Sequence, residues 1–163
     1  LAQVSKEEVE RLKGMPPVIF SAVQGTAKCY ILPPIQYPDG KYYIKIGAFS
    51  GTENMNEPIL ETPEEILGWY KSDGSERVVK HLKKSLHNVI PKLKVEKFIV
   101  DTCVTTHTKS GLPLICKVNE EYILCIGGNG QGAKSADSIG RMGAELALFG
   151  KENYELSFIH SRL

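Results

Sequence analysis

A glycine-rich loop behind an apolar run is the part of this sequence most suited to chemistry. The run ends at Ile126, glycines stand at positions 127, 128, 130 and 132, and a helix is expected from about residue 133 to 148, capped by Gly150. A strand, a glycine loop and a helix in this order commonly bind a phosphate or another anion, because glycine lets backbone N–H groups approach the ligand closely. Lys134, in the expected first turn, adds a cation where the helix dipole alone would favour an anion. This position favours a ligand-binding role for Lys134, with an exposed lysine beside a structural turn as the alternative.

The same loop also fits the dinucleotide-binding pattern G-x-G-x-x-G/A. The match covers residues 128–133, and Glu155 follows near where a ribose-binding acid would stand. Such a fold places the loop after its first strand, with several βα units still to come, whereas only about thirty residues follow here. We therefore expect a different fold, in which the backbone N–H groups of the loop still converge on an anionic ligand.

The elements that must position this loop predict an α+β class. The turn dipeptide Asp39-Gly40, between two β-rich runs, predicts a hairpin. Capping boxes begin at Ser5 and Thr62, and a stripe of apolar residues over 75–90 predicts a further helix. We therefore expect an α+β fold with a mixed, largely antiparallel sheet and flanking helices. Later strands are expected at 95–104, 112–118, 121–128 and 154–159.

The charge and cysteine content exclude several classes of partner. The chain has 20 basic and 19 acidic residues with no block of like charge, which argues against a nucleic-acid or membrane surface. No apolar run approaches the ~18 residues of a membrane-spanning helix. The cysteines contain no C-x-x-C pair, so neither a zinc site nor a disulfide framework is expected. We expect a soluble, intracellular protein without a metal site.

The last three residues predict a cellular location. Ser161-Arg162-Leu163 differs from the peroxisomal address S-K-L only by the exchange of one basic residue for another. The tripeptide stands at the end of the given sequence, where such an address is read. We expect a peroxisomal protein, or otherwise a cytoplasmic one.

Three segments of the sequence, GGNGQGAK at 127–134, DTCVTTHT at 101–108 and YIKIG at 43–47, point to a known family. Together they resemble the FAD-dependent amine oxidoreductases, and most closely monomeric sarcosine oxidase and its peroxisomal sarcosine/pipecolate relatives. The run GGNGQGAK at 127–134 resembles the carboxy-terminal flavin-contacting loop of that family. The run DTCVTTHT at 101–108 resembles its C-x-x-T-x-T segment, and YIKIG at 43–47 resembles its K-x-G strand. The resemblance covers nearly all of this chain but only the carboxy-terminal part of the family's chain.

The resemblance implies FAD as the cofactor and a role for each matched residue. Cys103 occupies the position of the cysteine that carries the flavin through a thioether, and Lys45 that of the lysine that helps transfer electrons to oxygen. Lys134 would bind a substrate carboxylate, and Tyr30 falls near an active-site tyrosine. Phe49 replaces a histidine that the family often has, and Lys109-Ser110 replaces its usual Pro-Asp. The loop residues implied to contact the flavin are Gly128, Asn129, Gly130, Gln131, Gly132 and Lys134.

The resemblance also implies a domain organisation and a function. Residues 1–100 would be a substrate-domain-like region and residues 101–163 the flavin-contacting carboxy-terminal segment. The family's amino-terminal dinucleotide-binding half is not part of this sequence, so we expect a missing FAD-binding half, which either belongs to the same longer enzyme or comes from a partner subunit. The implied activity is oxidation of a secondary amine or amino acid with oxygen, which gives hydrogen peroxide. Two alternatives stay open: a truncated, non-catalytic relative that binds a small ligand or a protein, and a stand-alone protein that binds NAD or FAD.

Overall fold

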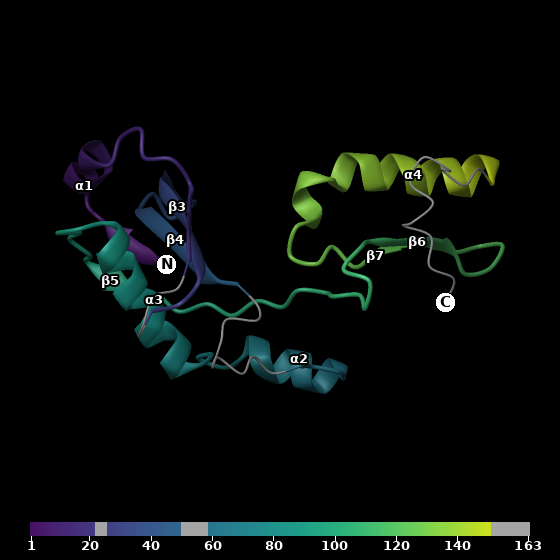
Figure 1. Cartoon of the computed structure of the whole chain (residues 1–163), viewed down its shortest axis with the longest axis horizontal. Coiled ribbons are helices and arrows are strands. Elements are labelled where there is room, and N and C mark those ends of the chain that lie inside the picture. The colour runs from purple at the N-terminus through teal and green to yellow at the C-terminus, as the bar shows by residue number, and fades with distance from the viewer. Residues whose placement is uncertain (22–25, 50–58, 151–163) are drawn as a thin grey trace. The chain divides into compact units, whose positions relative to one another are not determined.

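The computed structural model describes residues 1–21, 26–49 and 59–150 and has an α+β fold (Figure 1). The chain divides into two compact units, Leu1–Cys103 (unit 1) and Val104–Leu163 (unit 2). The boundary therefore falls inside the predicted C-x-x-T-x-T segment, directly after its cysteine. Every strand pairing in the described residues is antiparallel, which agrees with the fold class predicted from the sequence.

Unit 1 is a five-stranded antiparallel sheet with helices. The sheet has the order β2-β3-β4-β1-β5. The predicted hairpin at Asp39-Gly40 is confirmed: it joins β3 to β4, and Gly40 has the left-handed φ of 78° that such a turn requires. The elements are β1 (Ala2–Val4), α1 (Lys6–Arg11), β2 (Val18–Phe20), β3 (Cys29–Gln36), β4 (Tyr42–Ala48), α2 (Pro63–Tyr70), α3 (Glu76–Val89) and β5 (Lys97–Phe98).

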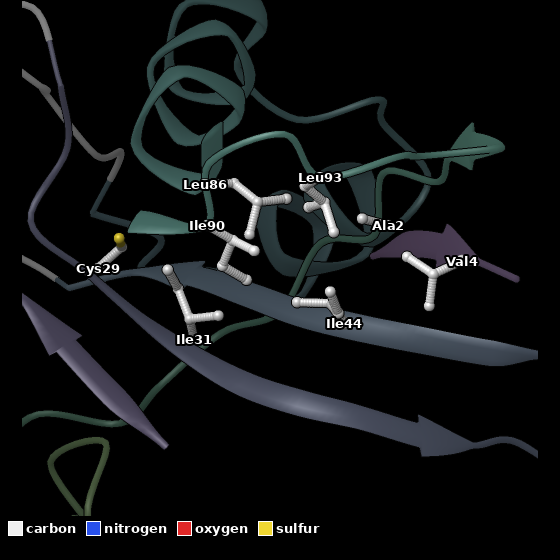
Figure 2. Packing of buried hydrophobic residues seen from close by; sticks show 8 residues of the cluster. All are labelled: Ala2, Val4, Cys29, Ile31, Ile44, Leu86, Ile90 and Leu93. Atoms are coloured by element: carbon white, nitrogen blue, oxygen red, sulfur yellow. The ribbon is translucent and has the colours of Figure 1, made fainter. Parts of the chain in front are cut away.

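One face of this sheet packs on α3 to form the core of unit 1. Figure 2 shows Ile31 of β3 and Ile44 of β4 pointing toward Leu86 and Ile90 at the C-terminal end of α3. Ile31, Ile44 and Leu86 are fully buried. Because side chains alternate along a strand, a slip of one residue would turn these side chains out of the core, so the core fixes the register of β3 against β4.

The helix predictions for unit 1 are confirmed more closely than the strand predictions. Helix α2 begins with the full capping box of Thr62 and Glu65, and α3 covers most of the predicted stripe. At the first predicted box only half forms: Ser5 accepts from the Glu8 N–H, but the Glu8 carboxylate pairs with Arg11. The predicted strand at 95–104 is wrong beyond β5, because its last residues bond to α2 instead of to a neighbouring strand.

Unit 2 is a hairpin covered by one helix. Strands β6 (Leu114–Lys117) and β7 (Ile123–Ile126) pair with one another, and α4 (Ala136–Phe149) follows a short 3-10 helix, η1 (Gly132–Lys134). Met142 and Leu146 of α4 pack against Ile115 of β6. The predicted strands and the cap at Gly150, which has a φ of 60°, are confirmed. The predicted helix start is wrong, because the α-helix begins at Ala136.

Two further observations concern partners and location. Within residues 1–21, 26–49 and 59–150, no helix combines the length and the apolar content that crossing a bilayer requires. Glu155, the predicted strand at 154–159 and the predicted address at 161–163 lie outside the described residues.

Candidate functional site

The glycine loop forms a tight turn whose shape follows from its sequence. Asn129 and Gly130 both have positive φ, 50° and 71°, and the Gln131 N–H donates to the Gly128 carbonyl oxygen at 2.8 Å. Two successive left-handed residues closed by this bond are a type I′ turn, for which Asn-Gly is the preferred pair. Gly128 allows a close approach of the backbone, because a Cβ there would lie 3.2 Å from the Cα of Gly132. The loop is therefore a defined structure.

A second segment, residues 105–108, lies against this turn and is bonded to it through Asn129. The Asn129 N–H donates to the Thr106 carbonyl oxygen at 2.9 Å. The Thr108 N–H donates to Asn129 Oδ1 at 3.0 Å, and Asn129 Nδ2 donates to the Gly127 carbonyl oxygen. A Cβ on Gly127 would come within 2.4 Å of Thr108 Cγ2, so the two segments touch closely. The structure thus brings together two of the three motifs on which the resemblance depends.

Beyond the turn, the loop presents backbone donors without acceptors. In the described part of the chain, the N–H groups of Gly130, Gly132 and Ala133 donate no hydrogen bond. A Cβ built on Gly132 meets nothing within 4 Å, so the space beside that residue is open. Unpaired backbone donors next to open space suit an acceptor that carries negative charge.

The electrostatic argument for Lys134 needs a correction. Lys134 is exposed and ends the 3-10 helix η1, so it precedes the first turn of α4. The charged residue in that first turn is Asp137, whose carboxylate is the charge that a helix N-terminus favours. Lys134 is therefore not in the first turn of α4, where a cation would be unfavourable. The position of Lys134 relative to the helix dipole is no longer a reason to assign it to a ligand. Its cation remains within one residue of the open amide of Ala133.

Three other side chains complete the surface around the turn. Gln131 is exposed beside the turn and Thr105 lies next to Gly130, where a Cβ would be 3.8 Å from Thr105 Cγ2. The Thr105 hydroxyl and His107 Nε2 are 2.7 Å apart, and both side chains are exposed. His107 is thus a hydrogen-bonded surface residue near the loop.

Cys103 lies at the end of unit 1 on a segment tied to α2. The Trp69 Nε1–H donates to the Cys103 carbonyl oxygen at 3.1 Å, and the Thr102 hydroxyl donates to the Trp69 carbonyl oxygen at 3.1 Å. Thr102 is buried against Gly74, whose φ is 67°. The backbone of Cys103 is therefore anchored while its side chain is exposed. A fixed backbone with an accessible thiol is what covalent attachment of a cofactor needs.

Two of the other cysteines, Cys29 and Cys125, have a thiol pKa above its usual value. Burial raises the pKa of the Cys29 thiol, and a hydrogen bond with Ser85 opposes that shift. Burial also raises the pKa of the Cys125 thiol, and the nearby Cys116 adds to the shift. A raised pKa lowers the fraction of reactive thiolate at neutral pH. All four cysteines are free, and no group of metal-ligating side chains forms in the described residues.

Lys45 and Tyr30 share the face of the unit 1 sheet that is opposite the core. Tyr30 pairs with Gly47 across β3 and β4, and Leu32 pairs with Lys45, so Tyr30 and Lys45 take diagonal positions on that face. The Tyr30 ring lies across Gly47, where a Cβ would be 2.5 Å from the Tyr30 hydroxyl oxygen. Lys45 is exposed. This packing explains the glycine of the K-x-G motif, because a side chain at Gly47 would clash with the Tyr30 ring.

Phe49, which stands where the family often has a histidine, belongs to the same face. Its ring meets the Tyr30 ring edge to face at a centroid distance of 5.7 Å, and the Lys28 ammonium lies 5.7 Å from its centroid. Lys45, Tyr30 and Phe49 belong to unit 1, and the glycine loop belongs to unit 2.

Two contributors to the loop were missed by the sequence analysis. Thr106 and Thr108 were noted only as members of a motif, yet they supply the carbonyl and the N–H that bond to Asn129. The Asn129-Gly130 dipeptide was a signal for the type I′ turn, although not for the partners of the Asn129 side chain.

Comparisons with family models, with curated proteins and with solved structures find no match to this chain. The functional argument therefore depends on the residues and on their geometry.

Proposed function

We propose that this chain is part of a flavin-dependent oxidase that oxidises a secondary amine or an amino acid of the sarcosine or pipecolate type and passes the electrons to oxygen, giving hydrogen peroxide. The observation that carries the proposal is the junction at Asn129. It joins residues 105–108 to the glycine loop, and these are two of the segments that the resemblance assigns to the flavin. Beside this junction the loop presents three backbone donors that have no acceptor among residues 1–21, 26–49 and 59–150.

The glycine loop of unit 2 is proposed to bind one edge of the flavin, and Cys103 of unit 1 is proposed to attach it. A bound flavin would supply the two-electron acceptor that oxidation of a carbon–nitrogen bond needs. The N–H groups of Gly130, Gly132 and Ala133 would donate to its electron-rich edge and stabilise negative charge there. Cys103, with an anchored backbone and an exposed thiol, is the candidate for covalent attachment. Lys134 offers a cation for a substrate carboxylate.

In unit 1, we propose that the sheet face that carries Lys45 contacts the substrate and oxygen. The exposed ammonium of Lys45 would stabilise the negative charge that develops as oxygen accepts electrons. Tyr30 and Phe49 offer an aromatic surface to the apolar part of an amine and to its cation. A peroxisomal location, proposed from residues 161–163, suits an enzyme that produces hydrogen peroxide.

The proposal is tested by following the flavin absorbance of the whole natural protein through the two half-reactions. Without oxygen, an N-methyl amino acid should bleach that absorbance, and a hydroxy acid of the same size should not. Addition of oxygen should restore the absorbance and release hydrogen peroxide. A protein that binds no flavin, or whose flavin is not reduced by any secondary amine, would contradict the proposal.

The role of Lys45 is tested in the same experiment. We expect Lys45→Met to slow reoxidation by oxygen far more than reduction by the amine. Lys97→Met is a matched control, because register pairing places Lys97 on the same sheet face two strands away, where it is also exposed. Equal slowing of both half-reactions by Lys45→Met, or equal effects of the two variants, would remove the role assigned to Lys45.

A further inference from the structure

Both polar atoms of the Asn129 side chain form hydrogen bonds with other residues of the protein. Its Oδ1 accepts from the Thr108 N–H at 3.0 Å, and its Nδ2 donates to the Gly127 carbonyl oxygen. Its own N–H donates to the Thr106 carbonyl oxygen at 2.9 Å. The resemblance implied that Asn129 contacts the flavin. The geometry gives its side chain a different task, because the amide group already has partners on both sides.

These bonds constrain the first half of the loop, whereas its second half, Gly132–Lys134, is ordered by the 3-10 helix. Glycine gains more conformational freedom on unfolding than any other residue, and four glycines stand at 127, 128, 130 and 132. Within the loop itself, one bond from the Gln131 N–H to the Gly128 carbonyl oxygen closes the turn. The bonds of Asn129 tie that turn to residues 106–108, and Thr108 is tied in turn to Leu112 by a hydroxyl bond of 2.7 Å.

We infer that Asn129 is the positioning residue of the glycine loop: it holds the turn against residues 106–108, so that the N–H groups of Gly130, Gly132 and Ala133 face the ligand before it binds. This inference rests on the proposed function for the identity of the ligand, a flavin. A donor set that is ordered beforehand does not lose conformational entropy when the ligand arrives. It also stabilises charge better than donors that must reorient.

Asparagine meets two requirements that no simple replacement meets together. Its φ of 50° is in the left-handed region, which asparagine tolerates better than most residues. It also offers an acceptor to Thr108 and a donor to Gly127. Glycine would keep the backbone conformation and lose both side-chain bonds. Aspartate would keep the acceptor, but its carboxylate would face the Gly127 carbonyl oxygen without a proton to donate.

The test uses Asn129→Gly, with Asn119→Gly as a matched control. Asn119 lies in the turn between β6 and β7, and its Oδ1 accepts from two backbone N–H groups, those of Glu121 and Tyr122, at 2.9 Å each. Both variants therefore remove an asparagine that organises a turn next to the same hairpin. The first readout is the ¹⁵N heteronuclear NOE of the Gly130 and Gly132 amides in the full chain. The second is the equilibrium constant for reduction of the bound flavin, measured against a reference dye.

We expect Asn129→Gly to lower the NOE of both glycines and to reduce the equilibrium constant for flavin reduction at least tenfold. Asn119→Gly should change neither, and Asn129→Asp should fall between the wild type and Asn129→Gly. Unchanged NOE values in Asn129→Gly would overturn the inference, and so would a mobile loop that leaves the reduction equilibrium unchanged. If the protein binds no flavin, the proposed function fails, and the NOE values alone then decide whether Asn129 holds the loop.

Discussion

Lys45 and Asn129 are placed by different forces in the two units of this chain. Lys45 is held by the register of a sheet, because the residue before it, Ile44, is fully buried among the apolar side chains of unit 1. Asn129 is held by polar bonds between two loops, and the apolar cluster described in unit 2 is smaller, with Ile115, Met142 and Leu146 buried. A sheet position is fixed by the whole core, whereas the loop position depends on a few local bonds.

This difference predicts how the two regions respond to mutation. Damage to the core of unit 1 should reduce the stability of that unit and should move Lys45 only as a consequence. Damage to the loop bonds of unit 2 should change ligand chemistry with a smaller loss of stability. Three comparisons of stability in the two units follow, in order of decreasing effect, and the loop variants described above complete the contrast.

The largest effect is expected at Ile44. Ile44→Ala should lower the free energy of unfolding by about 2–5 kcal/mol, because it removes buried methyl and methylene groups and leaves a cavity. Lys45→Ala, at the next position on the other face of β4, should change it by less than about 0.5 kcal/mol. Urea unfolding followed by fluorescence of Trp69, the single tryptophan, reports on this unit. Similar losses in both variants would mean that the core does not fix the register of β4.

A smaller effect is expected where α4 packs on β7. A Cβ at Gly143 would lie 2.4 Å from Cys125 Sγ, whereas a Cβ at Gly140 meets nothing within 4 Å. Gly143→Ala should destabilise the protein by about 1–3 kcal/mol through overpacking, and Gly140→Ala should stabilise it by up to about 1 kcal/mol through helix propensity. Thermal unfolding followed by helical circular dichroism measures both changes.

A third substitution sharpens the result for Gly143. If the clash with the sulfur is the cause, adding Cys125→Ala to Gly143→Ala should recover much of the lost stability, and the two changes should not be additive. If the stability losses of the two single variants simply add in the double variant, the destabilisation by Gly143→Ala does not come from a clash with the Cys125 sulfur.

The smallest effect is a pH dependence in unit 1. Hydrogen bonds from Arg11 hold the pKa of the buried Glu8 carboxyl below its usual value, helped by the Lys94 N–H and opposed by burial. A pKa that is lower in the folded than in the unfolded state stabilises the protein above the unfolded value, about 4.3, and this stabilisation is lost as the pH falls through the folded value. The wild type should therefore lose more stability than Glu8→Gln between about pH 5 and pH 3. Parallel pH curves for the two proteins would show that the Arg11–Glu8 pair does not contribute.

The elements of the fold could be predicted from local signals, but the contacts around the loop could not. Three predicted features depend only on residues that are neighbours in sequence, and each is present in the structure: the Asp39-Gly40 turn, the Thr62 capping box and the Gly150 cap. The junction of Asn129 with Thr108 joins residues that are 21 apart in the chain, so it depends on how β6, β7 and the preceding segment fold together. No pattern in the sequence specifies such a contact.

Two errors have different causes. The strand expected at 95–104 is rich in apolar residues, but Trp69, more than thirty residues earlier, forms hydrogen bonds with its last residues. The helix expected from residue 133 begins later because Ser135 has a φ of −117° and a ψ of 8°, which separates the 3-10 helix from α4. In the first place a contact that is distant in sequence ends the strand, and in the second a local backbone conformation delays the helix.

The most direct test of the proposed function is the visible absorption spectrum of the whole natural protein before and after acid precipitation. We expect a yellow protein whose colour stays in the pellet, and a Cys103→Ser variant whose colour passes into the supernatant. That pair of results would show a flavin bound by this chain and attached through Cys103. A protein that is colourless at every stage would contradict the account.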